Sequence, residues 1–187
     1  MKLKILLLAL LMVSANCFAN HAEWNEGDII FMISKSKQAP YIQLATMSPY
    51  SHCGIIVYKG DTPYVLEASN VVKLTSLDDW FEKARFGTCM TKRVFDKPVK
   101  IRYKQYLGQK YDTAFKFNNG RMYCSELVYE IYKNQFGIEL CKPRKVKDYH
   151  IFGLGKLLKK RHINPNQLVV APSDIANSKY VKNTNWD

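Results

Sequence analysis

One cysteine of the sequence stands where a reactive thiol is expected. Cys124 directly precedes a segment, 125–136, whose apolar residues recur at helical spacing and which ends at Gly137. A thiol in the first turn of a helix meets the positive end of the helix dipole and unpaired backbone N–H groups, and both favour the thiolate. The position therefore suits a nucleophile. The alternative is a structural cysteine, either buried or paired in a disulfide.

A nucleophilic thiolate needs a base that takes and returns a proton, and the chain has four histidines. His21 lies near the N-terminus, and His150 and His162 lie in a basic C-terminal stretch. Only His52 lies in an apolar segment typical of a buried strand. By itself, such a histidine is more often part of a packed core than of a catalytic site.

A predicted hairpin adds an acidic partner to this histidine. If residues 59–60 form a two-residue turn, His52 lies opposite Glu67 in the following strand. Both side chains then point to the same face, within reach of a hydrogen bond, and such a carboxylate orients a catalytic histidine. A slip of one residue would send Glu67 to the other face. With Cys124 these residues form a candidate triad, whereas Cys53 faces the opposite side, toward the core.

The rest of the pattern predicts a single α+β domain with a small, mostly antiparallel sheet packed against helices. No internal repeat, low-complexity tract or linker divides the chain after its first residues. We expect strands at 29–33, 51–58, 63–68, 89–94 and 168–171, helices at 38–47, from Ser76 onward, at 97–107 and at 125–136, and a tail at 177–187.

The N-terminus has the order of a secretory signal peptide. Two lysines precede the apolar run 5–13, which is too short to span a bilayer, and small and polar residues follow it. We therefore expect residues 1–19 to be removed and residues 20–187 to form one exported domain. Its place would be the periplasm or cell envelope, or outside the cell where there is no outer membrane. Lipidation of Cys17 is the alternative for this segment.

The formal charge of +12 is the one unusual feature of the composition. An exported protein meets no genomic DNA, and no nucleic-acid-binding module is recognisable, so we expect no nucleic acid partner. Anionic envelope polymers or lipid head groups fit the charge better. The segment from Lys142 to Arg161 carries eight Lys or Arg residues against one Asp. It is either an adhesive patch or the solvated face of a helix.

The cysteines do not point to a metal. The four that follow the N-terminal segment show neither a CxxC pair nor the spacing of a zinc site, and they are too scattered for a disulfide framework. We therefore expect no metal and no cofactor. Pairing among Cys53, Cys89 and Cys141 remains open at this stage.

Several motifs together resemble the NlpC-type papain-like cysteine peptidases of bacterial cell walls. The motifs are Gly27-Asp28 before a strand, His52-Cys53-Gly54-Ile55, Glu67 in the next strand, Gly108-Gln109-Lys110-Tyr111, and Tyr123-Cys124-Ser125-Glu126-Leu127. The histidine half precedes the cysteine half, an order that resembles the circularly permuted, YiiX-like branch of this superfamily. The resemblance covers residues 26–137. It implies a papain-like fold in which the cysteine, at a helix N-terminus, lies against a sheet that carries the histidine.

The resemblance also implies an activity, namely hydrolysis of amide bonds, with the stem peptides of peptidoglycan as the first expected substrate. Backbone N–H groups at the helix start would bind the oxyanion, with Tyr50, Tyr123 or Ser125 as further oxyanion or substrate contacts. Tyr123 replaces the usual Asp before the cysteine, and Glu126 replaces the usual Gly. Substrate contacts of ordinary family members therefore do not transfer to this chain.

Two other functions are compatible with the same residues. The permuted branch also resembles acyltransferases of the lecithin–retinol type, which use a cysteine and a histidine on acyl esters or amides. A continuous apolar groove, rather than a polar cleft, would favour that chemistry. A module that binds the envelope without catalysis is the other alternative, and the intact Cys124, His52 and Glu67 count against it.

Overall fold

The fold is built on a six-stranded antiparallel sheet, which the computed structural model describes together with the rest of residues 24–184. The strand order is β4-β3-β2-β1-β5-β8. The strands are β1 (Ile29–Ser34), β2 (His52–Lys59), β3 (Thr62–Ala68), β4 (Val72–Ser76), β5 (Ala84–Arg93) and β8 (Lys182–Asn183). A separate two-stranded sheet pairs β6 (Arg144–Lys145) with β7 (Leu168–Val169).

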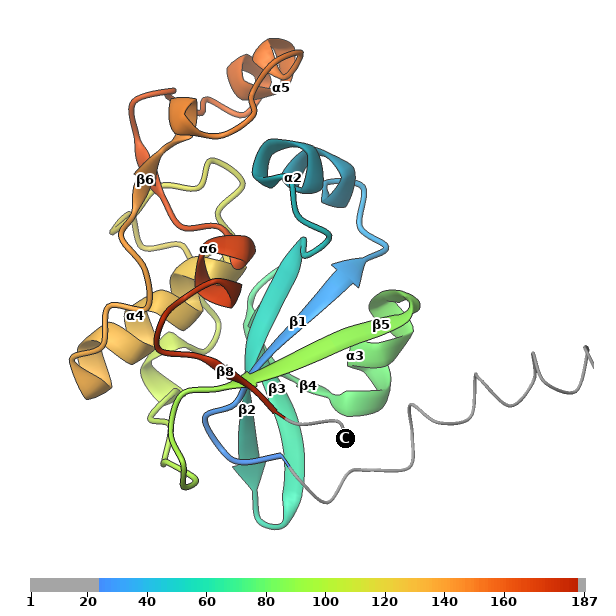
Figure 1. Cartoon of the computed structure of the whole chain (residues 1–187), viewed down its shortest axis with the longest axis vertical. Coiled ribbons are helices and arrows are strands. Elements are labelled where there is room, and N and C mark those ends of the chain that lie inside the picture. Colours follow the sequence, from blue (N-terminus) through green and yellow to red (C-terminus); the bar gives the residue numbers. More distant parts are fainter. Residues whose placement is uncertain (1–23, 185–187) are drawn as a thin grey trace, which may run out of the picture.

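Helices lie on both faces of the large sheet and beyond one of its ends (Figure 1). They are α2 (Ala39–Thr46), α3 (Leu77–Lys83), α4 (Cys124–Phe136), α5 (Gly155–Lys160) and α6 (Pro172–Ala176), with single 3₁₀ turns at Lys104–Tyr106 and Val146–Asp148. The helices α3 and α4 cover opposite faces, while α2 and α5 lie together beyond the end of β1 and β2. This arrangement leaves one end of the sheet, beneath α2 and α5, for a site.

Both faces of the central strands are buried. Along β1, Ile29 and Phe31 belong to the core under α4, and Ile30 and Met32 belong to the core around Trp80 of α3. A strand that is covered on both sides has no wet face, so its sequence is a continuous apolar run instead of an alternating one. The α+β class expected from the sequence is confirmed.

The longest helix has the ends that its sequence predicts. Glu126, in the first turn of α4, accepts a hydrogen bond from the backbone N–H of Tyr123 (3.2 Å), which satisfies a group that the helix leaves free. Gly137 ends the helix with a left-handed φ of 68°, and its N–H donates to the carbonyl of Lys133 (3.0 Å). Cys124 is the first residue of α4.

Two expectations about the second half of the chain are wrong. The segment 97–107 is not a helix, because Val99 and Ile101 donate their backbone N–H groups to Glu26 (2.9 Å each), which holds this part of the chain extended. Only Lys104–Tyr106 is helical. The expected tail contains β8, which adds to the sheet along β5.

In the first half of the chain, the expected elements agree more closely with the structure. The strands expected at 29–33, 51–58 and 63–68 and the helix expected at 38–47 are confirmed within a residue or two, whereas β4 and the start of β5 were not foreseen. The signal peptide expected at 1–19 lies outside the described residues. Within residues 24–184 no helix has the length and apolar character needed to cross a membrane.

Candidate active site

The structure brings Cys124 and His52 together at the end of the sheet. Cys124 is buried, with 3% of its surface exposed, and the neighbouring His52 and Cys53 both act on its thiol. His52 and Cys53 are the first two residues of β2. The thiol at the start of α4 is therefore seated directly on the first residues of the histidine strand.

Glu67 is the second partner of His52. The Nε2 atom of His52 lies 2.6 Å from Oε2 of Glu67, and both side chains are buried. Because Nε2 is engaged by the carboxylate, the other ring nitrogen, Nδ1, is the one available to Cys124. The order thiol, imidazole, carboxylate is the arrangement that nucleophilic catalysis requires.

The hairpin register that led to Glu67 is wrong by two positions, although the contact is right. Lys59 pairs with Thr62, so the two-residue turn is 60–61 and not 59–60. His52 consequently lies diagonal to Glu67 instead of directly opposite it. A turn displaced by one residue shifts the pairing by two, and a shift of two keeps every side chain on its face of the sheet.

A glycine allows the two strands to approach closely at this point. A Cβ atom added to Gly54 would lie 2.8 Å from the carbonyl oxygen of Leu66 and 2.5 Å from a methyl group of Val65. Backbone contacts this close exclude any side chain. Gly54 thus keeps β3 near enough for Glu67 to reach His52.

Three donors converge on the carboxylate of Glu67. Besides His52, it accepts hydrogen bonds from the hydroxyl of Thr75 (2.5 Å) and from Nζ of Lys83 (2.9 Å). Burial alone would raise the pKa of Glu67, but the hydrogen bonds from these groups and the charge of His52 lower it to about 2. Glu67 is therefore an anion throughout the physiological range. Thr75 and Lys83 carry no signal in the sequence that links them to the site.

The imidazole of His52 is held in its protonated form. Burial opposes protonation, but the neighbouring Cys124 thiolate and the Glu67 carboxylate raise the pKa of His52 to about 10. The indole of Trp80 stacks on the ring, with centroids 5.2 Å apart, and an aromatic face also favours a cation.

The pKa of Cys124 is shifted in the opposite direction. The hydrogen bond from the Cys53 side chain and the charge and hydrogen bond of His52 lower it well below its usual value, although burial works against this. The resting pair is therefore a thiolate and an imidazolium.

The other cysteines of the described region differ from Cys124. Burial raises the pKa of Cys53 well above its usual value and that of Cys141 to about 12. Cys89 is half-buried. Cys124, at the start of α4 and with a lowered pKa, is therefore the candidate nucleophile among the cysteines of residues 24–184.

The tyrosines and the serine expected near the oxyanion are all engaged elsewhere. The hydroxyl of Tyr50 donates to the sulfur of Met90 (3.0 Å), and that of Ser125 donates to the carbonyl of Val170 (2.7 Å). The hydroxyl of Tyr123 accepts from the N–H of Val170 (3.2 Å). Tyr123 and Ser125 line the same cavity as Cys124, whereas Tyr50 does not. The backbone N–H groups in the first turn of α4 remain the best candidates for binding an oxyanion.

A cavity of about 120 Å³ opens beside Cys124, and its surface is almost entirely apolar. Apolar cavities of about 150 Å³ hold a ligand as large as benzene. The aliphatic side chains that line the cavity come from α2, the segment around α5, and the chain on either side of β7: Ile42, Ala45, Val146, Ile151, Leu154, Leu157, Leu158, Ile163, Val169 and Val170.

Several polar side chains around this cavity are already hydrogen-bonded. Thr46 donates to the carbonyl of Ile42 (2.8 Å), and the hydroxyl of Tyr149 donates to Asp174. The sequence does not predict this cavity, because the residues that line it come from segments that are far apart in the chain.

One guanidinium stands at the edge of the cavity. Nη1 of Arg161 donates to Oε1 of Gln38 (3.2 Å), and Nε2 of Gln38 donates to the hydroxyl of Tyr111 (2.9 Å). This chain of hydrogen bonds ties the end of α5 to the start of α2. Burial and the nearby Cys124 raise the pKa of Tyr111, which is therefore a neutral hydroxyl.

The fold and the site define a class, a papain-like fold whose histidine strand precedes its cysteine helix. Residues 23–178 match the family described as permuted papain-like amidase enzymes, YaeF/YiiX, C92 family, and the chain belongs to this family. The uncharacterized protein YiiX of Escherichia coli strain K12 is 39% identical over 158 residues, which are 81% of this chain and 77% of that protein.

A solved structure shows the same fold. The crystal structure of YiiX from Escherichia coli O157:H7 has a TM-score of 0.80 and 33% identity, and the match covers 86% of this chain and 96% of that one. That protein is described as a metalloprotein. Among residues 24–184 of the present chain, no group of three or more His, Cys, Asp or Glu side chains is arranged to hold a metal ion.

Proposed function

We propose that the protein is a cysteine hydrolase of acyl amides and esters, in which Cys124 is the nucleophile, His52 the general acid and base, and Glu67 the residue that positions His52. The observation that carries the substrate class is the apolar cavity beside Cys124. The family supports the coarser activity, that of a papain-like amidase.

The first half-reaction forms a thioester. The thiolate of Cys124 attacks the carbonyl carbon, and the electron pair of the C=O bond moves to the oxygen, which first-turn N–H groups of α4 stabilise. The intermediate then expels the amine or alcohol, which takes its proton from the imidazolium of His52. Glu67 keeps Nε2 occupied throughout, so that Nδ1 faces the reacting atoms.

The second half-reaction releases the acyl group. Neutral His52 takes a proton from water, the resulting hydroxide attacks the thioester carbonyl, and collapse expels the Cys124 thiolate. The products are a fatty or other apolar acid and the original thiolate–imidazolium pair. An alcohol or amine in place of water would make the same residues an acyltransferase, the related alternative from the sequence.

The lining of the cavity favours an acyl chain over a stem peptide. Stem peptides carry carboxylates and ammonium groups, whereas the surface of the cavity is almost entirely apolar, with Arg161 as the cation at its edge. Burying an unpaired charge against such a surface is costly, but burying methylene groups gains about 0.8 kcal/mol each. Peptidoglycan is therefore the second candidate substrate, supported by the net charge of +12.

The two substrate classes are separated by one experiment. Purified protein and its Cys124→Ala variant are incubated with a series of N-acyl amides of increasing chain length and, in parallel, with purified muropeptides, and the products are identified by mass spectrometry. We expect Cys124-dependent release of the acid, with kcat/KM rising with chain length. Cleavage of muropeptides without cleavage of acyl amides would overturn the acyl proposal in favour of peptidoglycan.

Export is the remaining proposal. Residues 1–19 have the order of a signal peptide, and removal after Ala19 would leave Asn20 as the first residue. Mass spectrometry of the protein recovered from an envelope fraction tests this directly. A mature chain that begins at Cys17 would indicate lipidation instead.

A further inference from the structure

The end of the molecule that carries α2 and α5 has an unusual surface. Phe152, just before α5, is 93% exposed, and Met47, at the end of α2, is 69% exposed. Leu44 (48%) and Tyr41 (45%) continue this apolar surface along α2. Exposed apolar side chains that gather in one patch, unlike single ones, mark an interaction site.

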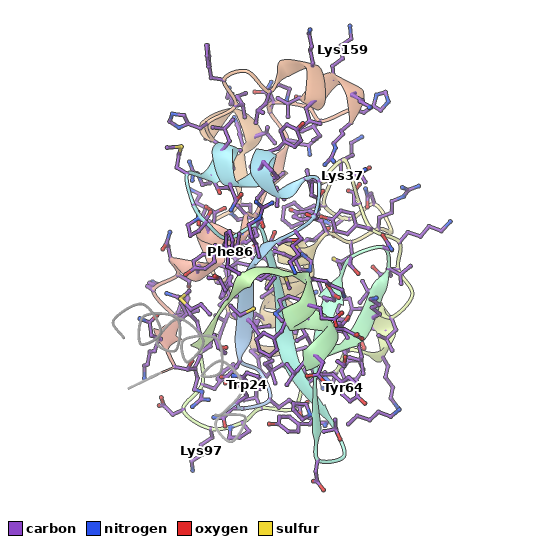
Figure 2. All side chains as sticks on the ribbon, turned by 90° about the vertical axis from the view of Figure 1, so that its right-hand side faces the viewer. Trp24, Lys37, Tyr64, Phe86, Lys97 and Lys159 are labelled. Carbon is purple, nitrogen blue, oxygen red and sulfur yellow. The ribbon has the colours of Figure 1, made fainter. Side chains whose placement is uncertain are left out.

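Lysines surround these apolar side chains. Lys156, Lys159 and Lys160 are exposed on α5, and among residues 24–184 none of them forms an ion pair with a carboxylate. Lys159 projects from the extreme end of the molecule, opposite Lys97, and Lys37 lies beside α2 (Figure 2). The basic segment 142–161 expected from the sequence thus has two parts. The lysines of α5 are exposed, whereas Arg144 lies over the ring of Tyr149.

This surface is continuous with the cavity. Tyr41 belongs to both, and Leu157 and Leu158 of α5 line the cavity while the lysines of the same helix face outward. The segments that carry α2 and α5 are joined at both ends, by the N–H of His150 on the carbonyl of Ala45 (2.8 Å) and by Arg161 on Gln38. The apolar and basic surface therefore borders the cavity that Cys124 lines.

We infer that this surface, formed by α2 and the segment 150–161, docks on an anionic phospholipid bilayer, with Phe152 and Met47 entering the interface and the α5 lysines meeting lipid phosphates. The inference rests on the proposed function, because a bilayer is where a long acyl substrate resides. An anionic wall polymer would account for the lysines but not for the exposed phenylalanine and methionine. Aromatic and aliphatic tips beside basic residues are typical of proteins that lie on membranes.

Flotation with lipid vesicles tests the inference without any need for turnover. Purified protein is mixed with vesicles of phosphatidylcholine plus phosphatidylglycerol, or of phosphatidylcholine alone, and the bound fraction is measured at low and physiological salt. We expect binding to the anionic vesicles only, weakened by salt because the screening length falls to about 8 Å.

Matched variants locate the surface. Lys156→Gln with Lys159→Gln should weaken partition about fivefold for each lysine removed. Lys59→Gln with Lys97→Gln should not, because Lys97 lies at the opposite end of the molecule (Figure 2) and Lys59 ends β2, which runs away from α2 and α5 (Figure 1). Phe152→Asn should also weaken it. Phe86→Asn is its control, because Phe86 is 90% exposed elsewhere and its φ of 57° suits asparagine.

The outcomes separate the docking surface from the proposed function. Hydrolysis of a soluble, short acyl amide without vesicles should be equal in all these variants and absent in Cys124→Ala, which should still float. Docking without any acyl hydrolysis would sink the proposed function alone. The docking inference is overturned if the parent fails to float with anionic vesicles, if both lysine pairs matter equally, or if Phe152→Asn binds like the parent.

Discussion

The two ends of the site are built on opposite principles. At the end of the sheet, each charged group of the catalytic set has a partner of opposite charge or a hydrogen-bond donor, as Glu67 has in His52, Thr75 and Lys83. Beyond Cys124, under α2 and α5, the surface of the cavity is almost entirely apolar. In the proposed function, the first region carries the reacting groups and the second binds the acyl chain of the substrate. Changes in the first should therefore alter turnover of every substrate, and changes in the second should alter preference among substrates.

The largest effect should follow removal of the nucleophile. Cys124→Ala is expected to lower kcat/KM at least about a thousandfold for acyl amides of every length, because the other thiol at the site, Cys53, has a raised pKa and is a poor nucleophile. Cys141→Ala, which removes a half-buried thiol with a raised pKa, should change it little. Turnover within tenfold of the parent in Cys124→Ala would show that the thiol is not the nucleophile.

The next largest effect should come from the carboxylate. Glu67→Gln keeps the shape of the side chain but neither stabilises the imidazolium nor enforces its tautomer, so kcat should fall by an order of magnitude or more. The free energy of unfolding should fall by about 3 kcal/mol, since buried donors lose a charged acceptor. Lys83→Gln, which removes a half-exposed partner only, is the control and should have a smaller effect on both.

The apolar region should show its role as a change in preference. Ala45→Phe places a ring in the cavity, and each methylene that it excludes from an acyl chain should cost about fourfold in kcat/KM. Short acyl amides should be cleaved as by the parent. Leu44→Phe, on the exposed side of the same helix, leaves the cavity unchanged and should leave the preference unchanged. A uniform loss for short and long chains would place the acyl group elsewhere.

The smallest effect concerns Cys53, which lies where the two regions meet. Loss of its hydrogen bond in Cys53→Ala should raise the pKa of Cys124, so the inflection in the rate of iodoacetamide labelling should move to higher pH, and Cys53→Ser should restore much of the shift. Identical labelling profiles for parent and Cys53→Ala would show that Cys53 does not lower the pKa of Cys124.

The pH dependence of turnover gives a further prediction. In the parent, turnover should fall as the pH rises through about 10, where His52 loses the proton that it gives to the leaving group.

The sequence predicted the paired groups better than the cavity, and the reason is physical. His52 and Glu67 are connected by a local hairpin, and the period of two in a sheet preserved their contact although the turn lies one residue further along. By contrast, the helix expected at 97–107 is wrong. Val99, Ile101 and Tyr103 alternate along the chain, and this alternation indicates an extended segment. The cavity depends on how distant segments pack, and no local pattern records that.

The order of the strands along the chain has a consequence for biosynthesis. The histidine and its carboxylate are only fifteen residues apart and belong to one hairpin, whereas the nucleophile begins a helix that is made much later. A chain that emerges from its N-terminus can close the hairpin early, but docking α4 on β2 must await a long loop closure. Until then Cys124 has neither Cys53 nor His52 beside it and remains an ordinary thiol. In the nascent polypeptide Cys124 is therefore not yet a reactive thiolate, and it becomes one only in the completed fold.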